Sequence, residues 1–483
     1  MTGQSRPARP HSFDCSERGI SAELARMIRN ILFILAGVLA LSAQSAGKPN
    51  IIFLFADDLG YGDLSCYGHP YAKTPALDKL AKEGTRFTQA YVTGVTCCPS
   101  RTGMMTGKFP ATFSKYMSDH GFGDRETITE LLKKNGYSTG HFGKWHIGPK
   151  TENGTYGIDV INGNKRDTKD RATRGRDAYV IDAAIEFLEA NAKKDKPLYM
   201  NVWGHISHFP VSPPKAFSDR FKEVVVDESK FNDTMRDKFQ HCREFKGDID
   251  EGMRNYLGDV WSMDSGIGRL LKKVDELGLR KNTIVVFSSD HGPAPVKLGG
   301  GRNEAPSRID AARNMLGSPG IYRGGKHTQF EGGVRVPFII RWPGHVPAGR
   351  VNSTSVISFI DWLPTVCELT GTKNTAPNLD GEDVSDIWLG AKRTRTKPLF
   401  WRVGNVNARP AVRVGDWKYY QYNNKETGPM LYDLAKDPGE KRNLVKEKPQ
   451  VVRRLAGRIN DWIATLPKEY TKPNKQKKRD KKK

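Results

Sequence analysis

Two adjacent thiols are the first residues whose types and spacing could do chemistry. They belong to the stretch Cys97-Cys98-Pro99-Ser100-Arg101. Proline is favoured in the first turn of a helix, where its missing N–H leaves no hydrogen bond unmade. We therefore expect Cys97 to lie at a helix N-terminus, where the helix dipole favours an anion. The five residues alone are also compatible with an ordinary turn, half of a disulfide or a buried thiol.

Carboxylates follow two apolar stretches of the chain. Asp57 and Asp58 come directly after one of them, and Asp290 and His291 come shortly after another. Adjacent carboxylates repel each other unless a cation lies between them, and hard oxygen ligands suit calcium or magnesium. Each pair alone is compatible with a solvated turn, but together they predict a cation site made of three carboxylates and an imidazole.

Cationic and imidazole side chains follow in the same way. Lys144, His146, His208 and Lys326 each stand in a glycine-rich or polar cluster. Taken singly, such a histidine is commonly structural and such a lysine is commonly a surface charge. Because they come from separate segments, we expect them to neutralise an anionic substrate and to donate a proton to a departing oxygen.

The elements that must position these residues read as an α/β fold. Four apolar stretches that each end in a polar cluster predict strands, at residues 50–56, 137–142, 198–203 and 283–287. A further strand is expected at 338–341, and helices are expected near 75–83, after Pro99, at 126–134, at 177–191 and at 257–277. Open α/β sheets bind ligands at the carboxyl ends of their strands. The pattern therefore predicts a large, mainly parallel sheet covered by helices, with the polar clusters at one edge.

Two other segments do not follow this alternation. Residues 211–250 are polar and are expected to be an irregular excursion near the substrate. Past residues 363–377 the alternation ends, and short strands are predicted at 399–401, 411–414, 417–422 and 430–432, with a closing helix at 451–466. We thus expect a leader at 1–46, a catalytic domain at 47–375, a C-terminal α+β subdomain with a small antiparallel sheet at 376–467, and a disordered basic tail at 468–483.

The leader has the form of a secretory signal peptide. The apolar run Ile31 to Leu41 follows Arg29 and precedes small residues, and it is too short for a spanning helix. Met27 is an alternative start, and an uncleaved anchor is an alternative reading. We expect a secreted or periplasmic protein without stable membrane insertion. The six cysteines leave room for at most two disulfides once Cys15 is lost and Cys97 is used.

The charge balance favours a polyanionic partner. The chain has 483 residues and a net charge of +23, and residues 468–483 alone hold nine Lys or Arg against two acids. Nucleic acid and a sulfated polysaccharide are both compatible with this charge, and a solubilising role is the plain alternative for the tail. The composition is that of a large globular protein and excludes a disordered chain and a disulfide scaffold.

From Pro49 to about Leu434 the order of these motifs resembles that of the type I sulfatases, in particular the arylsulfatases and N-acetylgalactosamine-6-sulfatases. The resemblance implies an alkaline-phosphatase-like fold and oxidation of Cys97 to formylglycine by a maturation enzyme. It further implies one calcium ion bound by Asp57, Asp58, Cys97, Asp290 and His291, with Arg101 steadying the nucleophile and Lys144, His146, His208 and Lys326 acting on the sulfate. Many relatives have asparagine in place of His291, so His205 is an alternative ligand.

The resemblance implies a sulfatase that acts on sulfate monoesters of carbohydrates or aryl groups, and no nucleic-acid partner. A hydrated aldehyde suits this chemistry because one hydroxyl attacks sulfur and the other later expels sulfate, whereas a thiol has no comparable means of release. Two alternatives stay open. One is a phosphodiesterase or phosphonate hydrolase of the same superfold, and the other is a non-catalytic binder of sulfated glycan.

Overall fold

Strand β1 (Asn50–Ala56) runs through the interior of a nine-stranded sheet and leads directly to Asp57. The strand order is β4-β3-β5-β1-β6-β7-β2-β8, and β9 pairs with β2. This computed structural model describes residues 47–114, 121–148, 152–162, 173–296, 306–403, 409–422 and 428–470. The predicted signal peptide and most of the basic tail lie outside these residues.

The large sheet is mixed and mostly parallel, as predicted. Its parallel part consists of β1, β3 (Ser138–Gly143), β4 (Val160–Asn162), β5 (Leu198–Trp203) and β6 (Thr283–Ser289). Strand β7 (Arg335–Arg341) is antiparallel to both β6 and β2 (Thr85–Tyr91), and β8 (Arg350–Asn352) and β9 (Ile357–Ser358) are parallel to β2. The predicted strands agree with β1, β3, β5, β6 and β7, whereas β2 was not predicted.

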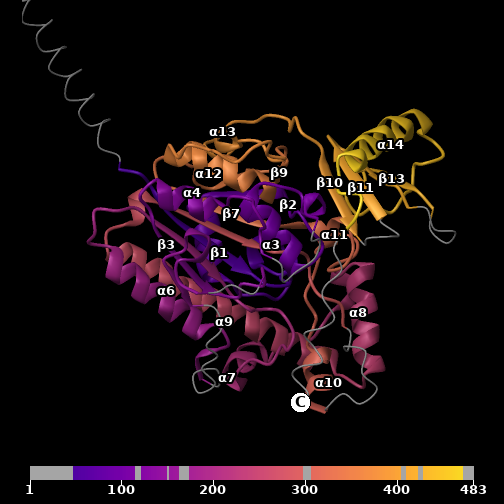
Figure 1. Ribbon diagram of the computed structural model, residues 1–483. Helices are drawn as coiled ribbons and strands as arrows, with labels where there is room; N and C mark the ends of the chain where they lie inside the picture. The colour runs from indigo at the N-terminus through magenta and orange to yellow at the C-terminus, as the bar shows by residue number, and fades with distance from the viewer. Residues whose placement is uncertain are drawn as a thin grey trace, which may run out of the picture. The chain divides into compact units, whose positions relative to one another are not determined.

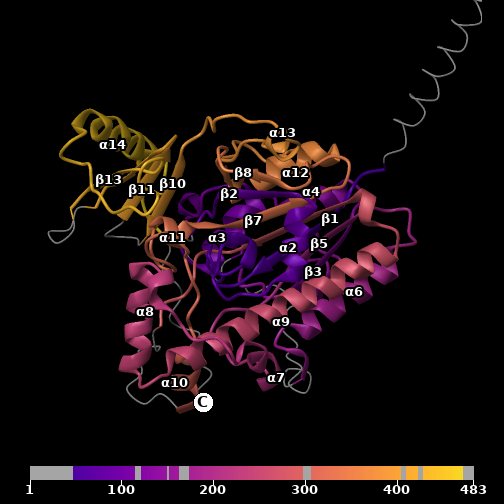
Figure 2. The ribbon, with the colours of Figure 1, turned by 180° about the vertical axis from the view of Figure 1, so that it is seen from behind.

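Helices cover both faces of this sheet. Successive side chains of β1 point to opposite sides, so apolar side chains line both faces and both must be buried. Phe53 packs in a core with Trp362, while its neighbour Leu54 belongs to a second core with Val260. Figure 1 shows the two layers, and Figure 2 shows them from behind. The first core includes residues of α3 (Cys97–Thr106), α4 (Ile128–Lys134) and α12 (Trp362–Thr370); the second includes residues of α2 (Pro75–Lys82), α6 (Ala178–Asn191) and α9 (Ile249–Glu276). Each fully buried large apolar side chain contributes roughly 1.5–3 kcal/mol relative to exposure.

Two helices correct the sequence analysis. The prediction of an irregular segment at 211–250 was wrong for α8 (Asp233–Glu244), which Asn232 caps by accepting a hydrogen bond from the Met235 amide. Short helix α7 (Lys215–Ser218) precedes it. Helix α12 was not predicted, because only the end of the α/β alternation was expected there. It contacts α3 and α4 and therefore packs with the helices that cover the large sheet. Short helices α10 (Pro306–Arg313), α11 (Glu331–Val334) and α13 (Ser385–Trp388) complete this part.

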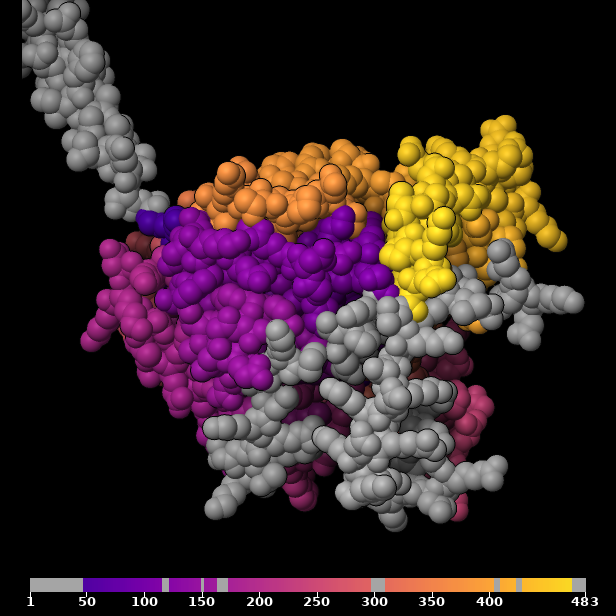
Figure 3. Space-filling model, viewed as in Figure 1, coloured from indigo at the N-terminus to yellow at the C-terminus, as the bar shows by residue number. Residues whose placement is uncertain are grey.

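The C-terminal sheet is antiparallel and is covered by one helix, as predicted. Its strands are β10 (Leu399–Val403), β11 (Arg409–Val414), β12 (Trp417–Tyr420) and β13 (Met430–Asp433), and helix α14 (Pro449–Ala464) packs on β11 and β12. Trp462 of α14 meets Phe109, which follows α3, with ring centroids 5.8 Å apart. The described residues from Lys48 onward form one compact unit, and Figure 3 shows the coloured C-terminal residues, in yellow, against the catalytic part.

Some predictions concern the ends and the cysteines. The Tyr470 hydroxyl donates to the Ala111 carbonyl at 2.7 Å, so the described start of the predicted tail is attached to the catalytic part. Within the described ranges, no disulfide joins Cys66, Cys97, Cys98, Cys242 and Cys367. None of the described helices is long and apolar enough to cross a membrane.

Candidate active site

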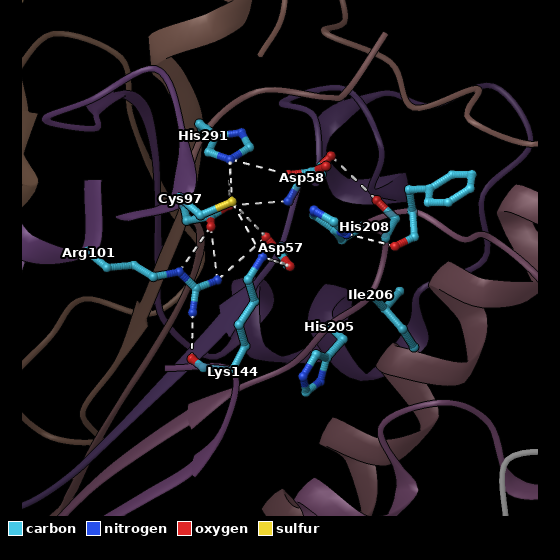
Figure 4. A network of polar contacts seen from close by, with 12 residues as sticks. Asp57, Asp58, Cys97, Arg101, Lys144, His205, Ile206, His208 and His291 are labelled. Atoms are coloured by element: carbon cyan, nitrogen blue, oxygen red, sulfur yellow. Dashed lines mark hydrogen bonds and ion pairs between the residues drawn. The ribbon is translucent and has the colours of Figure 1, made fainter. Parts of the chain in front are cut away.

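The site lies where the parallel strands of the large sheet end. Strands β3, β5, β1 and β6 are neighbours, so the residues that follow them are brought to one edge. Lys144 follows β3, Asp57 and Asp58 follow β1, His208 follows β5, and Asp290 and His291 follow β6. Figure 4 shows the side chains of Asp57, Asp58, Lys144 and His291 around Cys97. The prediction that separate polar clusters meet at one edge is confirmed.

Cys97 is the first residue of α3, as the proline signal predicted. Its sulfur lies 3.3 Å from His291 Nε2, 3.4 Å from Lys144 Nζ, 3.5 Å from Asp57 Oδ1 and 3.7 Å from Lys326 Nζ. Burial, together with the charge of Asp57, raises the pKa of the Cys97 thiol well above its ordinary value. Because the thiolate is the nucleophilic form, an unmodified Cys97 is poorly activated in this site.

A compact set of metal-ligand atoms surrounds the sulfur. One atom each of Asp57, Asp58, Cys97 and His291 lies within 4.8 Å of all the others, and all four residues are buried. Lys144 Nζ lies 2.5 Å from Asp57 Oδ2, and Lys326 Nζ lies 2.6 Å from Asp58 Oδ1. Carboxylate oxygens of this kind are the ligands that calcium prefers in proteins.

The two carboxylates are held in the charged form. Burial by itself raises the pKa of Asp57, but the charges of Lys144, His208, Arg101 and Lys326 together outweigh this and leave the pKa well below its ordinary value. Burial acts in the same direction on Asp58, and the charges of His291 and Lys326 lower its pKa overall. The site therefore offers ionised oxygen atoms, which a hard cation requires.

His291 turns one ring nitrogen toward the carboxylates. Its Nδ1 donates to the Gly292 carbonyl at 2.9 Å, so Nε2 carries the lone pair when the ring is neutral. This nitrogen faces Asp58 Oδ1 at 3.2 Å and Asp290 Oδ1 at 3.5 Å. Acceptor atoms this close repel one another unless a cation lies among them or the imidazole takes a second proton. The arrangement fits a metal ion in this cluster.

Arg101 fixes Asp290 on the far side of the site. Its Nε and Nη2 donate to Asp290 Oδ2 at 3.1 and 2.9 Å, and its Nη1 donates to the Lys144 carbonyl at 2.7 Å. The guanidinium is fully buried and lies over the rings of Phe55 and Trp203. Asp290 Oδ1 in turn accepts the Asp58 amide at 3.1 Å. The structure thus links Arg101 to the acidic cluster through Asp290.

The other three histidines named in the sequence analysis differ in their surroundings. His208 is half-buried beside the carboxylates, and its Nδ1 donates to the Phe209 carbonyl at 2.7 Å. Burial lowers the pKa of His208 despite the nearby Asp57. His146 is exposed. His205 lies apart from Cys97 in Figure 4.

His205 contacts a carboxylate outside this cluster. Its Nδ1 lies 3.1 Å from Asp177 Oδ1, and Asp177 also accepts the backbone amides of His205 and Ile206. The metal-ligand cluster contains His291 and does not contain His205. The contact between Asp177 and His205 was not predicted. Asp177 precedes helix α6 and His205 follows strand β5, and nothing in the sequence indicates that the two side chains meet.

A buried nucleophile position at a helix N-terminus, facing carboxylates, an imidazole and two ammonium groups, is suited to the hydrolysis of anionic esters. The sulfatase family model matches residues 49–372 of this chain, and a model described as "N-sulphoglucosamine sulphohydrolase, C-terminal" matches residues 320–465. The chain belongs to the sulfatase family. It is a type I sulfatase, a sulfuric ester hydrolase.

Similar proteins agree over most of the chain. Human arylsulfatase A is 29% identical over 86% of this chain and 86% of its own length. An N-acetylgalactosamine-6-O-sulfatase of Bacteroides thetaiotaomicron is 30% identical over 86% of this chain and 93% of its own length. The solved structure of Ps i-CgsB with a neocarrahexaose superposes with a TM-score of 0.70 at 25% identity, covering 88% of this chain and 95% of the other.

Proposed function

We propose that this sulfatase hydrolyses sulfate monoesters on carbohydrates, with formylglycine made from Cys97 as nucleophile and one calcium ion beside it. The observation that carries the proposal is the position of the Cys97 sulfur, which two ammonium groups, a carboxylate and an imidazole approach within 3.7 Å. When present, the formylglycine hydrate supplies one hydroxyl that attacks sulfur and a second whose deprotonation expels sulfate.

The remaining residues bind, orient and move protons. Lys144 pairs with Asp57 and Lys326 pairs with Asp58, and both ammonium groups lie within 3.7 Å of the Cys97 sulfur, so they would hold the negative oxygens of the sulfate. His208 has Nδ1 committed to a backbone carbonyl, which leaves Nε2 to pass a proton to the departing sugar oxygen. Exposed His146 would meet the sugar side of the ester.

Asp57, Asp58, His291 and Asp290 would hold the calcium ion, with an oxygen at position 97 completing the set. Bound there, the ion supplies positive charge that stabilises negative oxygen atoms next to it. The fit rests on the acceptor atoms of Asp58, Asp290 and His291 that already face one another. Arg101 keeps Asp290 in place.

Carbohydrate is favoured as the carrier of the sulfate. The relatives named above include a sulfatase of N-acetylgalactosamine-6-sulfate type and a structure holding a neocarrahexaose, and a further relative is an ulvan-active sulfatase of Formosa agariphila. The net charge of +23 also suits a sulfated polymer. Export through the predicted leader and contact with a formylglycine-generating enzyme belong to the same proposal.

The rival is a phosphodiesterase or phosphonate hydrolase. A phosphonate monoester hydrolase of Agrobacterium radiobacter has the same fold, with a TM-score of 0.64 at 19% identity. Turnover of an aryl sulfate and of an aryl phosphate diester should be compared with protein in which conversion of Cys97 has been checked. We expect kcat/KM for the sulfate to exceed that for the diester by about 100-fold or more. The reverse order would reject the proposal, and no turnover of either by converted protein would favour a non-catalytic glycan binder.

A further inference from the structure

Lys326 reaches the site from a loop, residues 323–333, that we call the Lys326 loop. Its backbone is attached to both segments that carry the reacting groups. The Lys326 amide donates to the Pro293 carbonyl at 3.0 Å, just after His291, and the next amide, that of His327, donates to the Val95 carbonyl at 2.9 Å, just before Cys97. The loop thus lies against the nucleophile segment and the metal-ligand segment at once.

The opposite side of the Lys326 loop is held by the C-terminal sheet. Gln329 is bound at three atoms: its Nε2 donates to the Arg409 carbonyl at 2.7 Å, its Oε1 accepts the Tyr422 hydroxyl at 2.7 Å, and its carbonyl accepts the Tyr420 hydroxyl at 3.2 Å. The Glu331 amide donates to Glu440 Oε2 at 2.7 Å. Residues far apart in the sequence therefore determine where the loop runs.

A buried ionic cluster joins the two parts. Glu331 of the loop, Lys418 of β12 and Glu440 beyond β13 are each 0% exposed. Lys418 Nζ lies 2.7 Å from Glu331 Oε1 and 3.7 Å from Glu440 Oε1. The other oxygen of Glu331 accepts the Tyr91 hydroxyl at 2.5 Å and lies 3.2 Å from Arg335 Nη1. Charges without access to water are tolerated only in such a fully paired geometry, so the cluster permits few positions of the loop.

We propose that Lys418 and Glu440 of the C-terminal part are positioning residues for the sulfatase site, which act through Glu331 and the Lys326 loop to set the position of the Lys326 ammonium group. The C-terminal sheet is then required for turnover and not only for stability. This inference rests on the proposed contact between Lys326 and the sulfate.

The test is a double-mutant cycle between Lys418→Met and Lys326→Ala. Each variant is measured well below its own melting temperature, for kcat/KM on an aryl sulfate and for the dissociation constant of inorganic sulfate. Lys418→Met alone should lower kcat/KM about tenfold, but in the Lys326→Ala background it should cause less than about a twofold further loss. Additive losses, or unchanged kcat/KM in folded Lys418→Met, would overturn the proposal.

Arg395→Met is the matched control. Arg395 forms a buried bidentate ion pair with Asp361, and its described polar partners all lie outside the Lys326 loop. It should lower the melting temperature as Lys418→Met does while leaving kcat/KM within about twofold. An equal loss of turnover in the control would show that any buried ion pair matters, and would also overturn the proposal.

Two further measurements test the proposal if Lys418→Met does not fold or if the wild type shows no turnover. If Lys418→Met does not fold, Tyr422→Phe removes one hydrogen bond to Gln329 and should give a roughly threefold loss that also disappears in the Lys326→Ala background. If the wild type turns over no aryl sulfate, the proposed function fails, and the cycle measured on sulfate binding alone still decides whether Lys418 acts through Lys326.

Discussion

Asp58 is the carboxylate on which most of the metal-ligand cluster depends. Lys326 Nζ contacts both of its oxygens, His291 Nε2 lies 3.2 Å from one of them, and its amide donates to Asp290. Removing this carboxylate should weaken calcium binding, since it takes away a ligand and the group that His291 Nε2 faces. We expect Asp58→Ala to raise the dissociation constant for calcium about 100-fold and to abolish turnover.

Calorimetric titration of the metal-stripped protein measures calcium binding without any need for activity. Asp182→Ala is the control, because it removes a carboxylate that pairs with Arg174 and Arg269 away from the site. In the wild type, chelation should abolish turnover and calcium should restore it. Unaltered calcium affinity in Asp58→Ala would contradict the ligand assignment.

Individual site residues could be predicted where the chemistry is local. Asp57, Asp58, Cys97 and His291 each stand at the end of a strand or the start of a helix, so fold class alone brings them together. The partner of His205 could not be predicted in this way. Asp177 reaches His205 across the ends of α6 and β5, and a contact of this kind follows from packing, which sequence spacing does not encode.

The Lys326 loop approaches its neighbours so closely that one of its glycines has no room for a side chain. A Cβ at Gly325 would lie 2.5 Å from the Pro293 carbonyl oxygen, a backbone atom that cannot turn aside. Gly325→Ala should push the loop away from the His291 segment and lower kcat/KM about tenfold or more. Steady-state kinetics on an aryl sulfate measures this.

Gly457→Ala is the matched control for that glycine. Gly457 lies in α14, and a Cβ there would meet nothing within 4 Å. The substitution should leave turnover unchanged and stabilise the protein by about 1 kcal/mol, because alanine favours a helix over glycine. If Gly325→Ala kept wild-type kinetics, the close fit of the loop would not matter for the reaction.

The ionic cluster between the loop and the C-terminal sheet should make stability depend on pH. Burial raises the pKa of Glu440 to about 7, whereas at Glu331 the charges of Lys418, Arg335 and Arg413 together outweigh burial and lower the pKa to about 2. A raised acid pKa stabilises the folded state below the unfolded value of 4.5, and this contribution is lost as the pH rises through about 7. The Glu331 contribution is lost only as the pH falls towards 2.

Glu440→Gln should therefore remove the loss of stability that accompanies a rise in pH through about 7. Between pH 5 and pH 7.5 the free energy of unfolding of the wild type should fall by on the order of 2 kcal/mol more than that of the variant. Urea denaturation at both pH values measures the difference. Parallel curves for the two proteins would show that Glu440 does not titrate in this range.

Secondary structure could be predicted where one apolar pattern dominates. Strands β1, β5 and β6 are continuous apolar stretches, and helix α9 has a clear apolar stripe. Helix α8 was missed because its apolar stripe consists only of Met235, Phe239 and Cys242 among charged residues. Helix α12 was missed because it lies where the α/β alternation was expected to end, although Pro364 is in its first turn, where proline is tolerated. Strand β2 was missed because Arg86 and Gln89 interrupt its apolar pattern. Its hydrogen bonds to β7 form the strand, and that pairing is not visible in the sequence.

Over the whole molecule, positive charge is concentrated at the C-terminal end. Residues 472–483, which lie outside the described residues, contain eight of the Lys and Arg residues of the chain against one acid. Deleting them should weaken binding to a sulfated polysaccharide at least several-fold at low salt and should leave kcat/KM for a small aryl sulfate unchanged. Binding measured across a salt series tests this. Equal polymer binding by the shortened protein at low salt would make the tail a solubilising segment.

The most direct test of the account is the chemical state of Cys97 in active protein. Of the two adjacent thiols, Cys97 alone has proline and arginine at the offsets that the maturation enzymes of this family are expected to recognise. Peptide mass spectrometry of the active fraction should find Cys97 lighter than the thiol form by about the mass of one water, and Cys98 unchanged, because the peptide carries formylglycine as the aldehyde from which the proposed hydrate nucleophile forms. Cys97→Ala should fold and be inactive, and Cys98→Ala should retain turnover. Full sulfatase activity from protein whose Cys97 is an unmodified thiol, or from Cys97→Ala, would contradict the account.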